Sequence, residues 1–426
     1  MTSAEREIPP PPASCTDFRG CSVGLACMLV AILLLRGSTL DVQDRVLIVA
    51  AAAAIPIGLF DLLVLRVHRR ASTGLDWTAP FAPSAARVAT KLLGLAVTLA
   101  AIALAYWTFP EYQGSFYDPW YRLLHRAAIP AAIVVPIYFA FIDGRQTDPR
   151  DAYWQIGRLV LGHPEDASRD AIGNHARGWL VKAFFLPLMI VYAHQEIDRL
   201  CSWHLQDPLW KNIVQFDFIY PLIFAVDLMF TTFGYTLSIR LMDTHVRSAE
   251  PTMLGWTVAL FCYMPFFSLM EAQYVAYDPG IGFSKWLEPV PPLRNLCGGT
   301  ILVLVAIYSL STVAFGWRFS NLTHRGVLTN GPYRFTKHPA YVTKNLSWWL
   351  MTVPFASHAG PLDGLRRSVL LALVNLVYFA RARTEERHLS RDPTYVAYAE
   401  WMNEHGMFAW LGRLVPALRY RAPAPR

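Results

Sequence analysis

Residues 326–341, GVLTNGPYRFTKHPAY, combine a tight turn with a group of polar and cationic side chains. Asn330-Gly331-Pro332 predicts the turn, because Asn and Gly tolerate positive φ while Pro fixes its own φ. His338 precedes a proline, so its backbone is pushed away from helical geometry and its polar groups are left free to meet a ligand. We therefore expect a ligand-binding loop at the mouth of an apolar helix, with these side chains available: Tyr333, Arg334, Lys337, His338 and Tyr341.

A second polar group follows the last apolar block, in residues 375–398, NLVYFARARTEERHLSRDPTYVAY. On a helix Arg381 and Glu385 share one face, and Arg383 and Glu386 share a neighbouring one. Opposite charges beside aromatic rings can hold a zwitterion, and S-adenosylmethionine is one. Methyl transfer from it mainly needs alignment and a dry, electrostatically matched pocket. The two segments together predict a site for this cofactor.

GVLTNGPYRFTKHPAYV and RARTEERHL, with Tyr395 and Tyr398 beyond them, resemble the isoprenylcysteine carboxyl methyltransferase family and its bacterial relatives, which share features with phospholipid methyltransferases. The resemblance covers about residues 322–402. It implies an S-adenosylmethionine-dependent methyltransferase with a lipidic or lipid-linked acceptor drawn from the bilayer. The family's Gly-x-Tyr…Arg-His-Pro-x-Tyr loop and its Glu-Glu pair enclose the cofactor. Carried over by motif, the expected cofactor contacts are Tyr333, Lys337, His338, Pro339, Tyr341, Asn375, Glu385 and Glu386.

The resemblance also implies catalytic roles for Arg381, Arg383 and Glu385. An ionised carboxylate acceptor needs no base, so Arg381 or Arg383 would orient it and partly neutralise its charge. An amine or thiol acceptor must lose a proton, for which Glu385 or Glu386 is the nearest candidate. Asn375 lies within an apolar block, where an amide serves equally well to join two helices.

Two positions depart from the family pattern. Lys337 replaces the usual Arg before His-Pro and cannot make a planar bidentate contact. Thr343 stands where a Gly is common. An altered or crowded cofactor pocket is therefore expected.

The elements that position these residues are apolar blocks. The chain has 426 residues, of which 54% are hydrophobic and only 16% charged, and the charges fall between the blocks. Blocks of this length match the hydrocarbon thickness of a bilayer. We predict an all-α, polytopic membrane protein of about ten transmembrane helices, near residues 22–35, 46–65, 88–109, 127–142, 179–193, 213–239, 254–276, 298–317, 346–357 and 368–380.

The distribution of Lys and Arg over the loops sets the expected orientation, because cytoplasmic loops are enriched in these residues. Both termini, the loop at 318–345 and the tail from Arg381 are then cytoplasmic, in a bacterial-type inner membrane or its equivalent. The expected domains are a Pro-rich head (1–21), a membrane scaffold of about seven helices (22–292) and a C-terminal methyltransferase-like module with its tail (293–426). The oligomeric state is left open.

Other classes of site and partner fit the sequence less well. The basic residues behind the net charge of +7 lie at the ends of the predicted spans, so no nucleic-acid partner is expected. The expected partners are membrane lipids and the substrate. No metal is expected: the six cysteines lack zinc spacing, and His194, Glu196 and Asp198 are taken as a solvated loop. Four acidic residues lie in or near apolar blocks: Asp61, Asp217, Asp227 and Glu271. A carboxylate inside a membrane is a functional candidate, whereas one at the membrane–water interface is not.

Two alternative functions remain open. Sterol and steroid reductases have a similar helical plan and a related His-Pro loop but use NADPH; Thr384-Glu385-Glu386 suits the methyltransferases better. The other alternative is a membrane scaffold or transporter with a relic cofactor module, which Lys337 and Thr343 would favour if they closed the cavity.

Overall fold

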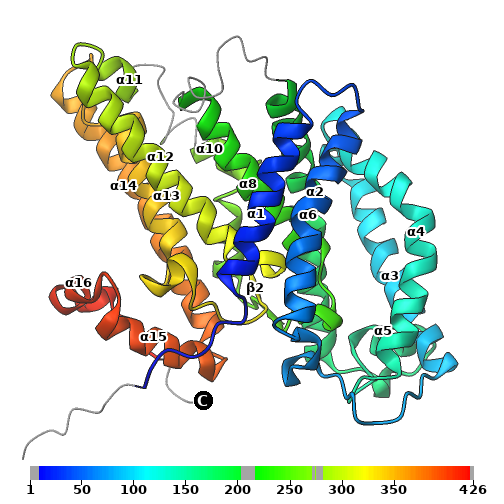
Figure 1. The fold of residues 1–426 in the computed structure, drawn as a ribbon. Helices are drawn as coiled ribbons and strands as arrows, with labels where there is room; N and C mark the ends of the chain where they lie inside the picture. The colour runs from blue at the N-terminus through cyan, green and yellow to red at the C-terminus, as the bar shows by residue number, and fades with distance from the viewer. Residues whose placement is uncertain (1–8, 203–215, 271–273, 275–281, 423–426) are drawn as a thin grey trace, which may run out of the picture.

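Helices form nearly all the regular structure in the computed structural model, which describes residues 9–202, 216–270, 274 and 282–422 (Figure 1). The α-helices are α1 (Phe18–Leu34), α2 (Val42–Leu63), α3 (Ala85–Thr108), α4 (Asp118–Asp143), α5 (Ala152–Val160), α6 (Arg169–Ser202), α8 (Phe216–Thr236), α9 (Met253–Leu260), α10 (Phe266–Met270), α11 (Phe283–Trp286), α12 (Pro291–Val313), α13 (Pro339–Thr352), α14 (Pro361–Leu389), α15 (Pro393–His405) and α16 (Ala409–Leu414). Two short strands, β1 (Ser248–Ala249) and β2 (Thr323–His324), pair antiparallel.

Short 3-10 turns join several of these helices. They are η1 (Val67–Arg69), η2 (Ala71–Thr73), η3 (Pro110–Tyr112), η4 (Ser115–Tyr117), η5 (Pro164–Asp166), η6 (Arg240–Met242), η8 (Gly316–Arg318), η9 (Gly331–Arg334) and η10 (Pro416–Leu418). One of them, η9, carries the Asn-Gly-Pro turn expected from the sequence: Gly331 has a φ of 53°, and a Cβ there would lie 2.8 Å from the Phe18 ring. The turn therefore needs glycine for both its conformation and its close packing.

Six helices in the described residues are long and apolar enough to cross a membrane: α2, α3, α4 with the turn before it, α6, α8 and α12. The shorter α1 is apolar over 17 residues. The protein is thus a mostly helical, integral membrane protein, and six candidate spans take the place of the ten predicted. Several predicted blocks are parts of longer helices, since α4 and α6 extend well beyond the apolar stretches at 127–142 and 179–193.

The block predicted at 254–276 is not one continuous helix. It forms α9 and α10, separated around Pro265. Proline has no N–H to donate and its ring clashes with the preceding turn, which favours a break there, although α4 continues through Pro130 and Pro136. Glu271, one of the candidate acidic residues, lies outside the described residues.

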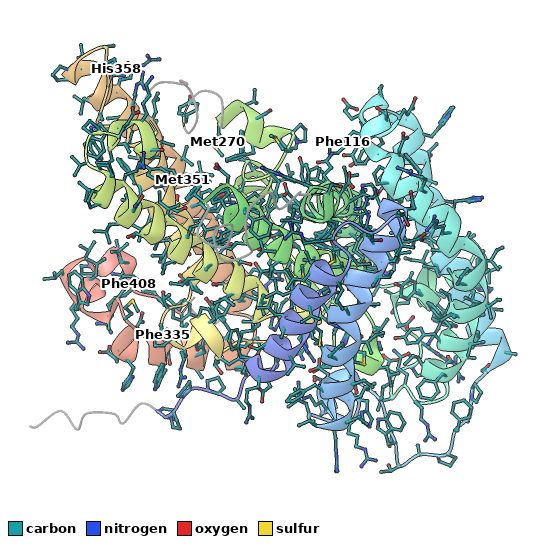
Figure 2. All side chains as sticks on the ribbon, turned by 45° about the horizontal axis from the view of Figure 1, so that its top comes forward. Phe116, Met270, Phe335, Met351, His358 and Phe408 are labelled. Atoms are coloured by element: carbon teal, nitrogen blue, oxygen red, sulfur yellow. The ribbon has the colours of Figure 1, made fainter. Side chains whose placement is uncertain are left out.

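The hairpin predicted from the last two blocks is present as α13 and α14. Each helix starts earlier than its apolar block, at Pro339 and Pro361, because proline is well accommodated in the first turn of a helix. In Figure 2, Met351 and His358 mark the tip of the hairpin, far from Phe335 in the loop that precedes it. The polar groups of both segments therefore return to one end of the molecule.

The helices pack in a sequence that joins the N-terminal region to the C-terminal one. α1 packs on α2, α2 on α6, α6 on α8, and α8 on α12, which in turn contacts α13; α9 packs against α14. At one side, α3 crosses α5 so closely that a Cβ on Gly94 would lie 1.9 Å from the carbonyl oxygen of Tyr153. α3 and α4 stand at one edge of the molecule and α13 and α14 at the other (Figure 1).

Large apolar side chains on α3 and α4 remain exposed, among them Leu104, Ile129, Val134 and Ile137. Figure 2 shows the side chains of this edge projecting away from the rest of the protein. A contiguous apolar surface on long apolar helices is what a lipid-facing side requires.

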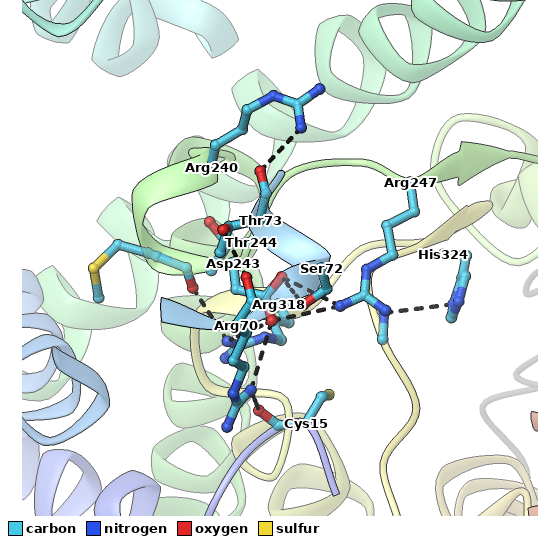
Figure 3. A network of polar contacts seen from close by, with 12 residues as sticks. Cys15, Arg70, Ser72, Thr73, Arg240, Asp243, Thr244, Arg247, Arg318 and His324 are labelled. Carbon is cyan, nitrogen blue, oxygen red and sulfur yellow. Dashed lines mark hydrogen bonds and ion pairs between the residues drawn. The ribbon is translucent and has the colours of Figure 1, made fainter. Parts of the chain in front are cut away.

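Buried charges at the junction of the two regions gather around Asp243 (Figure 3). This carboxylate pairs with Arg70 at 3.6 Å, Arg247 at 3.2 Å and Arg318 at 3.8 Å. Asp61 adds a second contact to Arg318 at 3.3 Å. Asp61 is therefore a partner of a buried arginine rather than an isolated intramembrane carboxylate.

The remaining acidic candidates also have clear surroundings. Asp217 is exposed, while Asp227 accepts hydrogen bonds from Tyr308 at 2.9 Å and Thr312 at 2.5 Å, which join α8 to α12. The expectation of a solvated loop at 194–198 is wrong, because these residues continue α6 to Ser202. Asp198 is partly exposed there and pairs with the buried Arg45 at 2.9 Å. No group of three or more His, Cys, Asp or Glu residues suited to a metal occurs in the part of the chain that the structure describes.

Candidate active site

One cavity lies where α9, α12, the 319–328 loop, η9, α13, α14 and α15 meet. It encloses about 1380 Å³ of empty space, its open mouth included. The predicted site residues in its wall are Tyr333, Lys337, His338, Tyr341, Arg381 and Glu385.

The loop wall is held in a defined conformation by its own sequence and by α15. His338 is the residue before α13 and has a φ of −130° and a ψ of 56°, outside the helical region as the following proline predicts. The Tyr398 hydroxyl donates to the carbonyl of Tyr333 at 2.6 Å. Asp392 caps α15 through Thr394 N at 2.8 Å and also meets His324 Nε2 at 2.8 Å. These contacts fix α15 against β2 and η9.

Glu386 is the point where the two predicted segments lock together. Its Oε1 lies 2.7 Å from Lys337 Nζ and 3.2 Å from His338 Nε2, and Arg383 Nη1 donates to Oε2 at 2.8 Å. Burial opposes ionisation of Glu386, but the hydrogen bond and charge of His338 and the charge of Lys337 outweigh it and lower the pKa to about 2. Glu386 is therefore an ionised residue that joins the loop to α14, and it does not line the cavity.

Glu385, its neighbour, faces the cavity instead. Its Oε2 accepts a hydrogen bond from the Tyr341 hydroxyl at 2.6 Å. No Lys or Arg pairs with Glu385 among the residues that the structure describes, so this carboxylate keeps its capacity for a cationic ligand group.

Arg381 is buried in the cavity wall without a carboxylate partner in the described chain. Its Nη2 donates to Asn321 Oδ1 at 2.5 Å, and its guanidinium lies 5.3 Å from the centroid of the Tyr263 ring and 5.0 Å from that of Tyr341. Two aromatic rings and an amide stabilise the cation partly. The arrangement leaves it able to bind an anion.

Other predicted site residues have different surroundings. Asn375 does not line the cavity; it donates to Asn345 at 2.5 Å and accepts from Trp349 Nε1 at 2.7 Å, which joins α13 to α14. Arg383 lies outside the cavity, and Pro339 is buried as the first residue of α13.

Neither departure from the family pattern closes the cavity. The Thr343 hydroxyl bonds back to the Pro339 carbonyl at 2.9 Å and lies outside the lining. Lys337 turns toward Glu386, with its Nζ 5.3 Å from the centroid of the Tyr420 ring. The crowding expected from these substitutions is absent.

The sequence analysis missed several residues of the wall, contributed by the N-terminal region and by the loop before the turn. Gly255, Ala259 and Tyr263 come from α9 and the residues after it, and Asn321 links Tyr263 to Arg381. No local pattern marks α9 as part of a site. The polar run SNLTHR directly before GVLTNG was a usable signal for the loop.

Two buried histidines, His324 and His388, belong to the same wall. Burial lowers the pKa of both, and that of His388 to about 3. His388 Nε2 lies 2.9 Å from Ser248 Oγ, so this ring hydrogen-bonds to β1 as a neutral imidazole. Their contacts hold β1, β2 and α14 together at the back of the cavity.

Residues 293–391, which contribute much of the cavity wall, match a known protein family. The family model described as "Isoprenylcysteine carboxyl methyltransferase (ICMT) family" matches residues 293–391. The matched range runs from the start of α12 to just past α14, and includes the loop and both glutamates. This family consists of methyltransferases that use S-adenosylmethionine as methyl donor. No curated protein and no solved structure matches the chain.

Proposed function

Because residues 293–391 are an ICMT-family methyltransferase domain, we propose that this protein transfers a methyl group from S-adenosylmethionine to a lipidic or lipid-linked acceptor at the cytoplasmic face of its membrane. One observation carries the proposal. The loop meets Glu385 in the cavity wall and Glu386 outside the lining, through the Tyr341–Glu385 and His338–Glu386 contacts at 2.6 and 3.2 Å.

The residues around the cavity suit the cofactor. Glu385 offers a carboxylate without a cationic partner in the described chain, which suits an ammonium or sulfonium group. The Tyr395 hydroxyl is buried in the wall with no hydrogen-bond partner, so it is available to a polar group such as a ribose hydroxyl. The bound cofactor supplies an activated methyl group, and the protein's task is to align it and exclude water.

Arg381 is the residue best placed to orient an anionic acceptor. It is buried, lines the cavity and has no counter-ion in the described residues. Inside a low-dielectric wall such a guanidinium binds a carboxylate more strongly than it would in water. For an amine or thiol acceptor, Glu385 is the carboxylate in the wall that can take the proton.

A cytoplasmic site agrees with the loop charges and with the fold. Residues 9–16 and α15 lie at the same end of the molecule as β2 (Figure 1). That end carries the basic loop at 318–345. The family implies an isoprenylated substrate, which enters from the bilayer.

The test is binding and turnover by the purified protein in detergent. S-adenosylhomocysteine should bind in calorimetry and raise the thermal midpoint, whereas NADPH should do neither. With labelled S-adenosylmethionine, label should enter a prenylated cysteine or a lipid extract. Glu385→Gln should weaken S-adenosylhomocysteine binding roughly 10–100-fold and lower turnover, and Arg391→Gln, an exposed change outside the cavity, should preserve both. Absence of S-adenosylhomocysteine binding to the folded wild type refutes the proposal.

A further inference from the structure

A second arginine in the cavity wall, Arg325, has even fewer partners than Arg381. It is 3% exposed and lies just after β2. Nη1 donates to the carbonyl of Gly234 on α8, while Nε and Nη2 have no hydrogen-bond partner. No carboxylate pairs with Arg325 within the described ranges. A fully buried guanidinium therefore borders the cavity with two donor nitrogens unused.

A third unused donor lies in the same wall. Thr323, two residues before Arg325, belongs to β2. Its hydroxyl is buried in the cavity wall and has no hydrogen-bond partner among the described residues either. His324, between them, also lines the cavity, but its Nε2 lies 2.8 Å from Asp392. Thr323 and Arg325 therefore border the same cavity with donors that no described group uses.

The surrounding charges do not compensate Arg325. Burial and the nearby Arg318 lower its pKa to about 10, so it still carries its charge at neutral pH. Glu250, whose backbone N–H donates to the Leu322 carbonyl at 2.7 Å, already accepts from Thr252 N at 2.9 Å and lies 3.7 Å from His388 Nδ1. Arg318 itself is paired with Asp61 and Asp243.

An isolated buried cation is costly, and charged groups buried in proteins are normally paired. A guanidinium fork with adjacent hydroxyl donors matches the geometry of a carboxylate or phosphate. We propose that Arg325 and Thr323 form an oxyanion-binding subsite of the cavity, separate from Arg381, which binds a carboxylate or phosphate group of a ligand. This inference rests on the proposed function, which supplies the ligands of the cavity. The bound anion is then either the carboxylate of the cofactor or an acidic group of the acceptor.

The experiment compares wild type with Arg325→Met, Thr323→Val and the exposed control Arg391→Met. The probes form two pairs, each with and without a carboxylate. The first pair is S-adenosylhomocysteine and 5′-methylthioadenosine, and the second is an N-acetyl-S-prenylcysteine and its carboxamide. If the cofactor supplies the anion, Arg325→Met weakens S-adenosylhomocysteine binding about tenfold or more and leaves 5′-methylthioadenosine unchanged. If the acceptor supplies it, the same loss appears for the prenylcysteine acid and not for its amide.

Thermal unfolding without ligand separates this role from a structural one. An arginine kept for a ligand leaves the midpoint of Arg325→Met equal to or above that of wild type, whereas a structural arginine lowers it. Should Arg325→Met not fold, Thr323→Val, which keeps the cation, must still lose a few-fold in affinity for the same ligand. Wild-type affinity for all four probes in the folded variants overturns the subsite.

One further arm keeps the subsite testable if the proposed function fails. Should wild type bind none of the four probes, inorganic phosphate is titrated while thermal unfolding is followed. Greater protection of wild type and Arg391→Met than of Arg325→Met supports the subsite, and equal protection of all three refutes it.

Discussion

Two neighbouring groups of buried and partly buried arginines differ in how their charge is compensated. Around Asp243, Arg70, Arg247 and Arg318 all meet a carboxylate (Figure 3). In the adjoining cavity wall, Arg325 and Arg381 have only carbonyl, amide and aromatic partners within the described residues. The first arrangement holds the two halves of the protein together, and the second leaves cations for a ligand to neutralise.

The glutamates repeat this contrast at adjacent positions. Glu386 is tied by Lys337, His338 and Arg383, while Glu385 faces the cavity and accepts only from Tyr341 among the contacts described. Compensated charges should therefore matter mainly for stability, and uncompensated ones mainly for binding. Four substitutions test this division.

The largest stability effect is expected for Asp243→Asn. It leaves three guanidinium groups short of a counter-charge in a site where the carboxylate is only 1% exposed. Removing one partner of a buried charge cluster costs about 3–5 kcal/mol. Denaturant unfolding in detergent measures it, with the exposed Asp217→Asn as the control. Equal stability of the two variants would contradict the structural role of the network.

The next effect is the pH dependence contributed by Glu386. Its pKa is lowered from 4.5 to about 2 in the folded protein, so its stabilisation is complete above the unfolded value and is lost as pH falls from about 5 toward 2. That shift corresponds to about 3 kcal/mol. Glu386→Gln should be less stable at neutral pH and should lack this part of the acid transition. If Glu386→Gln unfolds in acid with the same pH dependence as wild type, Glu386 does not stabilise the contact between loop and helix.

Glu385→Gln should act on binding rather than on stability. A hydrogen bond to a charged group contributes about 1.5–3 kcal/mol, which corresponds to roughly a 10–100-fold loss of affinity for S-adenosylhomocysteine. The thermal midpoint without ligand should stay near that of wild type. Calorimetry on Glu385→Gln and on the exposed control Glu400→Gln measures the difference. A destabilised variant with unchanged affinity would reverse the assignment of the two glutamates.

Arg383→Gln should have the smallest effect. The side chain is 36% exposed and pairs with Glu386, which keeps Lys337 and His338. An ion pair this exposed contributes less than about 1 kcal/mol. Turnover and thermal unfolding should both stay close to wild type. A large loss of turnover in a stable protein would instead support the catalytic role that the sequence predicted for Arg383 beside Arg381.

Much of the local structure could be predicted from the sequence. The non-helical backbone of His338 follows from Pro339, and the hairpin of α13 and α14 follows from two apolar blocks around a turn-rich stretch. Six candidate spans are found in the described residues where ten were predicted for the chain. One reason is that the apolar block at 254–276 satisfied the length rule, while its described part is divided into α9 and α10 near Pro265. Length and hydropathy alone do not distinguish a broken block from a spanning one.

The composition of the site was only partly predictable. The loop and the glutamate pair were found because motif and charge spacing are local. Tyr263 and Arg325 were not, since the first comes from the N-terminal region and the second is distinguished only by its lack of a carboxylate partner among the described residues. Asn375 was correctly recognised as a polar group needing a partner, and the structure gives it Asn345 and Trp349.

The sequence by itself determined the apolar helices, the turn at Gly331, the break before Pro339 and the types of charged group near the site, because these depend on covalent geometry and on neighbours along the chain. Only the tertiary structure decided which charges are neutralised. Glu385 and Glu386 are adjacent in sequence, yet Glu386 pairs with Lys337 of the loop while Glu385 faces the cavity and accepts from Tyr341. Charge compensation depends on distances between residues far apart in the chain, and packing alone sets those distances.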